Sequence, residues 1–318
     1  MIIDTLTSPI ILFFVLGLLA GFARSDLAIP EAMAKGLAIY LMAAIGLKGG
    51  VSIAATGFTP ELAVAGLAGI ALSFLLPFPV YGLLRAFGRL GQTDAAATAA
   101  HYGSVSLVTY ITASEMLAEA GMEAASFMVA VLAIMETPAI VSGLLLARRG
   151  TAAAVEGSSG NLWHEVLLNA SVVLLVGAMV IGFVAGPDGF APIKPVFEGG
   201  YRGILCLFLL DMGLLAARRL TGTRALTWRL AVLAILMPLV NGVIGATLGT
   251  VLGLDPATAA ILGVLAASAS YIAVPAAMRI ALPQADPGIY LSMSLGITFP
   301  FNVVVNIAFL SWFARMIG

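Results

Sequence analysis

Charged residues are scarce in this 318-residue sequence: Lys, Arg, Asp and Glu together make up 10% of it, whereas apolar residues make up 61%. A soluble domain of this length needs more polar surface to solvate its exterior, so the composition excludes an ordinary soluble protein. The formal net charge is −1, and the sequence contains no block of like charge. Nothing therefore indicates a nucleic-acid partner, and the composition indicates a protein that lies within a membrane.

Cysteine is almost absent. The single cysteine, Cys206, lies inside an apolar run, which excludes disulfide bonds and a cysteine-based metal site. The N-terminus also lacks the basic segment that opens a cleavable signal peptide, because the first cation, Arg24, follows the first apolar run. We therefore expect residues 8–23 to be retained as a membrane span.

Charged and Gly/Pro-rich breaks divide the sequence into ten apolar segments. A helix needs about 20 residues to cross roughly 30 Å of hydrocarbon, and most of the segments reach about that length. One bipolar stretch, 148–162, resembles a linker. The expected spans are 8–23, 31–50, 60–86, 95–119, 123–147, 163–186, 202–218, 228–252, 256–281 and 288–314.

The distribution of cations predicts the orientation. Threading the ten spans alternately places eleven cations on one side and four on the other. Short loops rich in Lys and Arg stay in the cytoplasm, so both chain termini are expected outside and the linker inside. The cytoplasmic set is Arg24, Lys35, Arg85, Arg89, Arg148, Arg149, Arg218, Arg219, Arg224, Arg229 and Arg279, and the outer set is Lys48, Lys194, Arg202 and Arg315.

A shift of 161 residues aligns two long stretches without a gap. The matched residues of the first stretch are Leu75, Pro77, Gly88, Asp94, Ala96, Ala99, Tyr110 and Ile111, and those of the second are Leu236, Pro238, Gly249, Asp255, Ala257, Ala260, Tyr271 and Ile272. Five helices per half is an odd number, so the halves enter the membrane from opposite faces, as in many secondary transporters. The sequence therefore predicts an inverted repeat of 1–150 and 163–318, joined by a linker at 151–162.

Small and hydroxyl-bearing residues gather at matching points of the two halves, in HYGSVSLVTYITAS (101–114) and LAASASYIAVP (265–275). Gly103 and Pro275 are points where a helix can unwind. Non-helical backbone at membrane depth is tolerated only where it is buried in protein or lines a wet cavity. A single cluster would favour close helix packing, but two at symmetry-related positions favour a substrate site.

Helix ends supply the chemistry for such a site. A half-helix N-terminus offers free N–H groups and a positive partial charge that suit a small anion, whereas the opposite end exposes carbonyls that suit a sodium ion. Hydroxyl groups can serve either ion because each both donates and accepts. The hydroxyl-bearing candidates are Ser104, Ser106, Thr109, Ser268 and Ser270.

Two acidic residues, Glu136 and Asp211, lie within apolar runs. An acid at mid-bilayer costs roughly 2.5–3.5 kcal/mol on insertion scales, so it usually faces a cavity or a partner. Glu136 is followed by Thr137 and Pro138, and the proline frees a backbone carbonyl one turn earlier. For each acid, a hydrogen-bonded clamp between helices stays an alternative to a role in ion binding. The comparable stretch of the other half contains Thr298, Pro300 and Asn302.

His101 and Ser104 lie three residues apart, on one side of a helix, and imitate a Ser/His dyad. The sequence has no nucleophile-elbow motif, no acid placed to orient the imidazole, and no HExxH. An intramembrane enzyme is therefore the weaker alternative. We expect His101 to support a broken helix by hydrogen bonding.

The stretch AAHYGSVSLVTY resembles the sodium-dependent bicarbonate transporter family of the SbtA type. The resemblance extends over nearly the whole chain, from about residue 5. It is also carried by TSPIILFFVLGLLAG near the N-terminus, AIGLKGG at 44–50, METPA at 135–139 and LLDMGLLA at 209–216.

The resemblance implies an all-α sodium/bicarbonate symporter of the bacterial inner membrane, with ten spans in gate and core domains drawn from both repeats. It implies a homotrimer, Na⁺ as coupling ion, no cofactor, and broken fourth and ninth spans that cross where the anion binds. The implied anion-site residues are Ser104, Val105, Ser106, Ser268, Ala269 and Ser270. The implied sodium ligands are Thr109, Glu136 and Asn302, with Asp211 as a candidate for coupling or gating.

Two features stay open at this point. Cyanobacterial members of the family are regulated by a cytoplasmic PII-like protein, but the expected inside linker here is only about fifteen residues long. The main alternative is a transporter of the same fold that carries another small anion or couples to protons through Glu136 or Asp211.

Overall fold

The computed structural model has helices as its only regular secondary structure within the part of the chain that it describes, which comprises residues 9–57, 59–148, 170–222, 225–271 and 273–318. The expected all-helical fold class is therefore confirmed. The predicted linker at 151–162 lies outside the described residues, as do two of the counted cations, Arg149 and Arg224, and Ile272 of the repeat framework.

The helices follow the apolar segments closely. In the first half they are α2 (Pro9–Phe22), α3 (Glu31–Thr56), α4 (Pro60–Leu75), α5 (Pro77–Ala86), α6 (Gln92–Gly103), α7 (Leu107–Glu119) and α8 (Met128–Arg148). In the second half they are α10 (Ala170–Phe190), η1 (Pro195–Gly199), α11 (Tyr201–Gly222), α12 (Trp228–Val251), α13 (Pro256–Ala267) and α14 (Ala273–Ala281). The last segment contains α15 (Pro287–Leu291), η2 (Ser292–Thr298), α16 (Phe299–Phe301), η3 (Asn302–Asn306) and α17 (Ile307–Ile317).

Six helical segments of the described residues are long and apolar enough to cross a membrane. Two shorter apolar helices, α2 and α13, accompany them. The chain is thus a multi-pass helical membrane protein, and the total of ten spans stays a prediction. The six segments are Glu31–Ala55, Pro60–Ala86, Met128–Ala147, Val173–Phe190, Trp228–Val251 and Pro287–Ile317.

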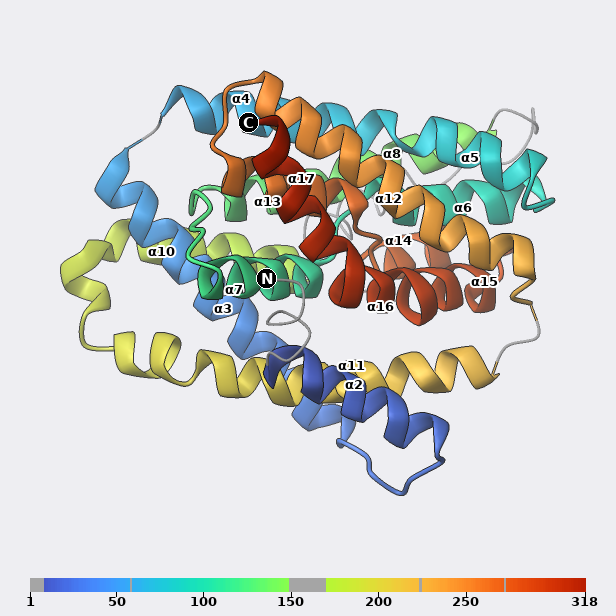
Figure 1. The fold of residues 1–318 in the computed structure, drawn as a ribbon, viewed down its shortest axis with the longest axis horizontal. Helices are drawn as coiled ribbons and strands as arrows, with labels where there is room; N and C mark the ends of the chain where they lie inside the picture. Colours follow the sequence, from blue (N-terminus) through green and yellow to red (C-terminus); the bar gives the residue numbers. More distant parts are fainter. Residues whose placement is uncertain (1–8, 58, 149–169, 223–224, 272) are drawn as a thin grey trace.

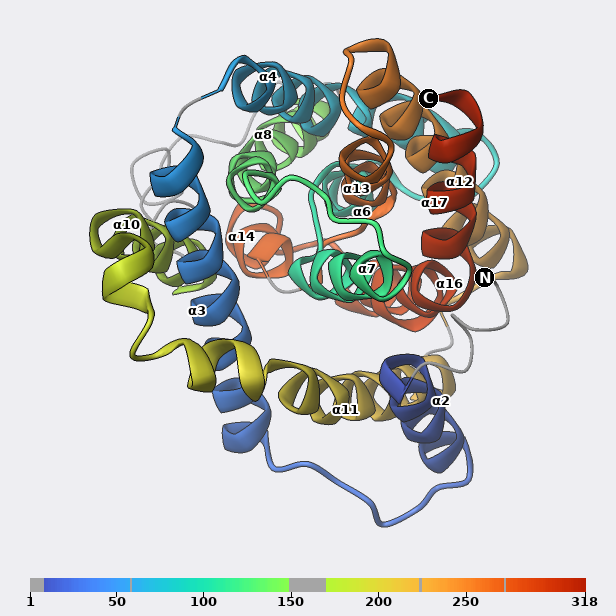
Figure 2. The same cartoon turned by 60° about the vertical axis from the view of Figure 1, so that its left-hand side comes forward.

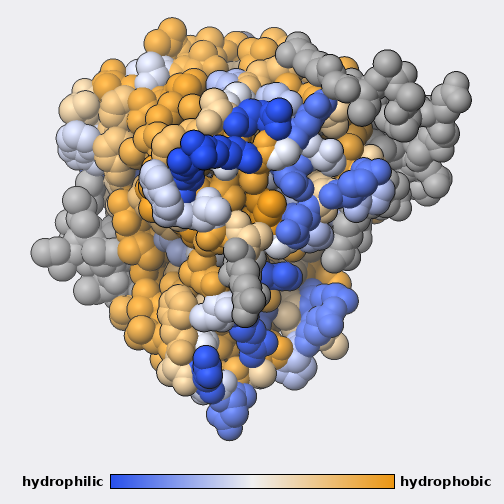
Figure 3. All heavy atoms as spheres, turned by 90° about the vertical axis from the view of Figure 1, so that its right-hand side faces the viewer, coloured by the Kyte–Doolittle hydropathy of each residue, from blue (hydrophilic) through white to orange (hydrophobic). Residues whose placement is uncertain are grey.

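Four helices, α2, α3, α10 and α11, lie along the outside of the remaining bundle (Figure 1). Turning the molecule shows that they flank the bundle on two sides, with α6, α7, α13 and α14 near its middle (Figure 2). We call these four the outer helices and the rest the inner bundle. The hydrophilic residues gather on the end of the molecule at which α5 ends and α12 begins (Figure 3).

The outer helices form two tight pairs through glycine. In the α2–α11 pair, a Cβ added to Gly17 would overlap the Leu210 carbonyl. In the α3–α10 pair, a Cβ on Gly50 would overlap the Met179 carbonyl, and one on Gly182 would overlap the Leu47 carbonyl. Without a hydrophobic effect between helices in lipid, such close backbone contact is a main source of association.

A proline in α12 explains one buried polar contact of the inner bundle. Pro238 has no N–H, so the Ala234 carbonyl loses its helical donor. The Thr298 hydroxyl donates to that carbonyl at 2.6 Å. The Tyr102 hydroxyl, 2.7 Å from Thr298 Oγ1, must then donate to Thr298, since the threonine proton is already used. These two hydrogen bonds link α6 to η2 and α12.

The end of α6 is fixed by a close approach to the junction of α4 and α5. A Cβ on Gly103 would overlap the Pro77 ring and lie 2.8 Å from the Ser73 carbonyl oxygen. Pro77 removes the N–H that would otherwise bond that carbonyl in a continuous helix. Only glycine allows α6 to end against this bend.

Candidate functional site

Two short non-helical segments lie at the positions of the predicted serine clusters. Ser104–Ser106 separate α6 from α7, and residues 268–271 follow the end of α13. Ser104 and Ser268 both have extended backbones, with ψ values of 175° and 163°. The six predicted anion-site residues are all buried, with at most 4% of any of them exposed.

The two segments contact each other. The Ser270 backbone N–H donates to the His101 carbonyl at 2.9 Å, which joins the second segment to the last turn of α6. This carbonyl was not among the predicted site groups. No residue-type pattern marks it, because any residue in the last turn of α6 carries a carbonyl without an i+4 donor.

Two of the serines cap the helices that follow them. The Ser106 hydroxyl accepts from the Thr109 N–H of α7 at 3.2 Å, and the Ser270 hydroxyl accepts from the Val274 N–H of α14 at 3.3 Å. Each hydroxyl keeps its own proton for a further acceptor. The first N–H groups of a helix have no intrahelical partner, so both helix starts offer donors to an anion.

The other two serines differ from each other. The Ser268 hydroxyl donates to the Val264 carbonyl at 2.7 Å, so its proton is used within its own chain segment. The Ser104 hydroxyl is buried and has no hydrogen-bond partner among the described residues. The Ser104 hydroxyl can thus both donate and accept a hydrogen bond at the break between α6 and α7, whereas the Ser268 hydroxyl can only accept one.

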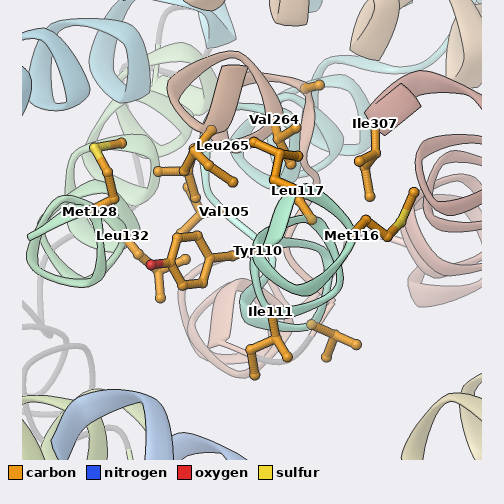
Figure 4. Packing of buried hydrophobic residues seen from close by; sticks show 14 of the residues in the cluster. Val105, Tyr110, Ile111, Met116, Leu117, Met128, Leu132, Val264, Leu265 and Ile307 are labelled. Atoms are coloured by element: carbon orange, nitrogen blue, oxygen red, sulfur yellow. The ribbon is translucent and has the colours of Figure 1, made fainter. Parts of the chain in front are cut away.

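Glu136 is buried in α8. It lies one helical turn from Leu132, which is in the same apolar cluster as Val105 (Figure 4), and one turn from Ile140, which packs in the cluster that contains Val274 of α14. Glu136 is 8% exposed, and its Oε2 atom is buried with no hydrogen-bond partner among the described residues. A buried carboxylate oxygen without a donor is costly, and a bound cation would offset this cost.

The predicted sodium ligand Asn302 holds the end of α13. Its amide donates to the Ala267 carbonyl at 2.9 Å, and its Oδ1 accepts from the Asn306 amide at 2.9 Å. One lone pair of Oδ1 stays available. Thr109, the third predicted ligand, is buried in the first turn of α7, where its N–H is bonded to Ser106.

Asp211 lies elsewhere. It is in α11, one of the outer helices, and it is only partly buried. No hydrogen bond among the described residues links it to the two segments. The structure therefore brings together the two serine segments and the end of α13 that Asn302 holds, and it places Asp211 in an outer helix.

His101 forms a hydrogen bond that supports α6, as expected. Its Nδ1 is 2.7 Å from the Ala97 carbonyl, and its ring stacks on Tyr290 with centroids 4.3 Å apart. Because a carbonyl only accepts, Nδ1 carries the proton in this bond. The Nε2 atom is buried without a partner among the described residues.

An array of buried helix ends, serine hydroxyls and one carboxylate can hold a small anion and a cation together. No curated protein matches the chain. A family model does match it, over residues 9–315. On that match the chain belongs to the Na⁺-dependent bicarbonate transporter superfamily.

Proposed function

We propose that the chain is a sodium/bicarbonate symporter that works by alternating access, with its anion site between the α6–α7 and α13–α14 segments. The observation that carries this proposal is the buried contact between the segments, from Ser270 to the His101 carbonyl, beside two helix starts. The family supplies the identity of the cargo and of the coupling ion. The same family favours a transporter over an intramembrane enzyme.

The architecture that we propose is ten spans in a five-plus-five inverted repeat, with α6–α7 and α13–α14 as broken, crossing spans. The glycine-packed pairs of outer helices support it. In the numbering of the ten expected spans, the pair α2–α11 packs the first span against the seventh, and the pair α3–α10 packs the second span against the sixth. An axis that exchanges the halves turns one pair into the other, as an inverted repeat requires.

The bicarbonate oxygens would accept hydrogen bonds from the first N–H groups of α7 and α14 and from Ser106 and Ser270. Ser104 would add a third serine hydroxyl, which has no hydrogen-bond partner among the described residues. The backbone groups of Val105 and Ala269 would line the same space, and Ser268 would contribute as an acceptor. Buried N–H groups at two helix starts favour a small anion over a neutral ligand.

Sodium would bind beside the anion, with oxygen ligands from Glu136, Thr109 and Asn302. Sodium binding first would offset the cost of the buried carboxylate and prepare the site for the anion. One Na⁺ with one bicarbonate moves no net charge, so transport would use the chemical gradient of sodium, about 1.4 kcal/mol for each tenfold ratio.

The outer helices would act as the gate and the inner bundle as the moving core. Arg202 of α11 pairs with α7, because its guanidinium lies 2.8 Å from Glu115 and 3.8 Å from Glu119. By the orientation that the cations predict, this pair lies on the outer side of a bacterial inner membrane. It would hold the outer side closed in this conformation, and Asp211 would act within the gate.

The assembly is proposed from the family alone. We propose a homotrimer with both chain termini outside, and a PII-like regulator as a partner on the cytoplasmic side, where the short linker is expected.

The proposal is tested by uptake of labelled bicarbonate into cells of a host that lacks its own transporters. Uptake is expected to require sodium, and Ser106→Ala or Ser270→Ala should lower it about tenfold or more, since a hydrogen bond to a charged group contributes about 1.5–3 kcal/mol. Ser311→Ala is the control, because that hydroxyl is also buried but donates to the Ile307 carbonyl within its own helix, α17. Uptake that proceeds equally in potassium would exclude sodium symport.

Proton coupling is the second candidate, and the unpartnered Glu136 oxygen is the observation that favours it. It predicts uptake driven by an imposed pH step in the absence of sodium. Glu136→Gln should abolish that uptake. A panel of competing anions in the same assay would identify a cargo other than bicarbonate.

A further inference from the structure

A basic and aromatic cluster lies where α5 ends and α12 begins. The Arg229 guanidinium lies 5.5 Å from the Trp228 ring centroid and 5.9 Å from that of Phe87. The two rings meet edge to face at 5.6 Å. Together they hold a half-buried guanidinium in a fixed position at the edge of the inner bundle.

Two further arginines come from the turn that carries Phe87. The Arg85 guanidinium donates to the Leu90 carbonyl at 2.6 Å, which braces the turn. Arg89 has a φ of 58°, in the left-handed region that non-glycine residues rarely adopt. Leu90 fixes this conformation through its N–H, which bonds the Leu84 carbonyl. The side chains of Arg85 and Arg89 are exposed.

No ion pair within the described part of the chain involves Arg85, Arg89 or Arg229. The cluster therefore carries three cations that an external anion can bind. The loop after α5 and the loop before α12 both lie on the side that the cation distribution predicts to be cytoplasmic. Cations at a membrane surface attract anionic lipid headgroups.

An exposed apolar stripe begins at the cluster and runs along α12 into the membrane-spanning region. Trp228 is 66% exposed, and Val232 and Ile235 follow one and two turns later with 44% and 43% exposed. Residues spaced in this way share one face of a helix. The cluster thus combines a cationic head site with an apolar path of the kind that an acyl chain needs.

We propose that Arg85, Arg89 and Arg229 bind the phosphate headgroup of an anionic phospholipid, whose acyl chain lies along the α12 stripe. Trp228 and Phe87 position Arg229 at the boundary between headgroup and acyl chain, where tryptophan is enriched in membrane proteins. The site is separate from the transport site and depends only on the placement of the chain in a membrane.

The test uses the purified full chain with Trp163 and Trp312 replaced by phenylalanine, so that Trp228 is the only fluorophore of its kind. The protein is reconstituted into phosphatidylcholine vesicles that contain the same small fraction of either brominated phosphatidylglycerol or brominated phosphatidylcholine. Quenching of Trp228 then reports which lipid occupies the site. One arginine near the surface contributes about a fivefold preference, so the brominated anionic lipid should bind at least fivefold more tightly.

The variants separate the charge from the stacking. R85Q/R89Q/R229Q should remove the preference, and Arg229→Lys should lower it partly because it keeps the charge but loses the planar contact. The single changes Arg85→Gln and Arg89→Gln should each lower it, which keeps the test decisive if the triple variant does not fold. Arg24→Gln is the matched control, since Arg24 is also exposed with a φ of 55° but lies in another loop.

Equal quenching by the two brominated lipids would overturn the proposal, and so would a full preference in the triple variant. Loss of the preference on adding inorganic phosphate would show a site for free phosphate and would overturn the lipid assignment. None of these readouts involves transport, so the proposal can fail while the symport proposal stands, and the reverse.

Discussion

The segments Ser104–Ser106 and 268–271 resemble each other in sequence but only in part in their contacts. Ser106 and Ser270 have the same structural role, because each caps the helix that follows it. Ser104 and Ser268 do not, because Ser268 bonds the Val264 carbonyl while Ser104 has no partner among the described residues. Both segments therefore precede a helix start that a serine caps, and the different bonding of Ser104 and Ser268 decides which of these two hydroxyls is left for a ligand.

The packing behind the segments differs as well. The first segment follows Gly103, which approaches the Pro77 ring, whereas the second follows Ala267, whose carbonyl accepts from the Asn302 amide. The two breaks are thus held in place by different means: a glycine contact in one half and an asparagine in the other.

Among the changes that test this difference, Gly103→Ala should have the largest effect on stability and uptake. Its Cβ would overlap Pro77 and separate α6 from the α4–α5 bend, which should destabilise the fold by about 1–3 kcal/mol and abolish most uptake. Thermal unfolding of the purified variant and labelled uptake measure both effects. Gly82→Ala is the matched control, because a Cβ there meets nothing within 4 Å. If the two variants behave alike, the close approach does not fix the first break.

Asn302→Ala should have the next largest effect, on the second segment. It leaves the buried Ala267 carbonyl without its donor, which should lower the free energy of unfolding by about 1–3 kcal/mol. If Asn302 also binds sodium, the sodium concentration for half-maximal uptake should rise in Asn302→Asp much less than in Asn302→Ala, since Asp keeps an oxygen ligand. Unchanged sodium dependence in Asn302→Ala would limit this residue to its structural role.

Ser104→Ala and Ser268→Ala should have the smallest effects on stability, and they should differ in their effect on the KM for bicarbonate. Ser104→Ala removes the unused hydroxyl and should raise the KM for bicarbonate about tenfold. Ser268→Ala removes a local hydrogen bond that contributes about 1 kcal/mol, and it should change the KM less. Concentration series of labelled uptake measure both values. A larger KM change for Ser268→Ala would reverse the roles assigned to the two serines.

The class of the protein and its helix boundaries follow from local properties of the sequence, because apolar length, glycine and proline act within a few residues. The expected span 60–86, for example, corresponds to α4 and α5 with a bend at Pro77. The contact between the two serine clusters was implied by the family resemblance. The use of each hydroxyl was not, because Ser104 and Ser268 are alike in sequence and differ only in what packs around them.

Asp211 and Thr298 illustrate the limit further. An acid in an apolar run signals a buried polar environment but not which one, and the structure places Asp211 in the outer helices, away from the serines. Thr298 was noted only as a polar neighbour of Pro300, yet it bonds the Ala234 carbonyl that Pro238 frees in another helix. A proline signals a carbonyl in need of a donor, and only tertiary structure identifies the donor.

The most direct test of coupling at the two segments is the entry of labelled sodium into proteoliposomes under an imposed inward bicarbonate gradient. The account predicts that the bicarbonate gradient drives sodium inward in the unmodified protein, and that S106A/S270A loses this entry while R24Q keeps it. Sodium entry that does not respond to the bicarbonate gradient would contradict the account, as would full coupling in the double serine variant.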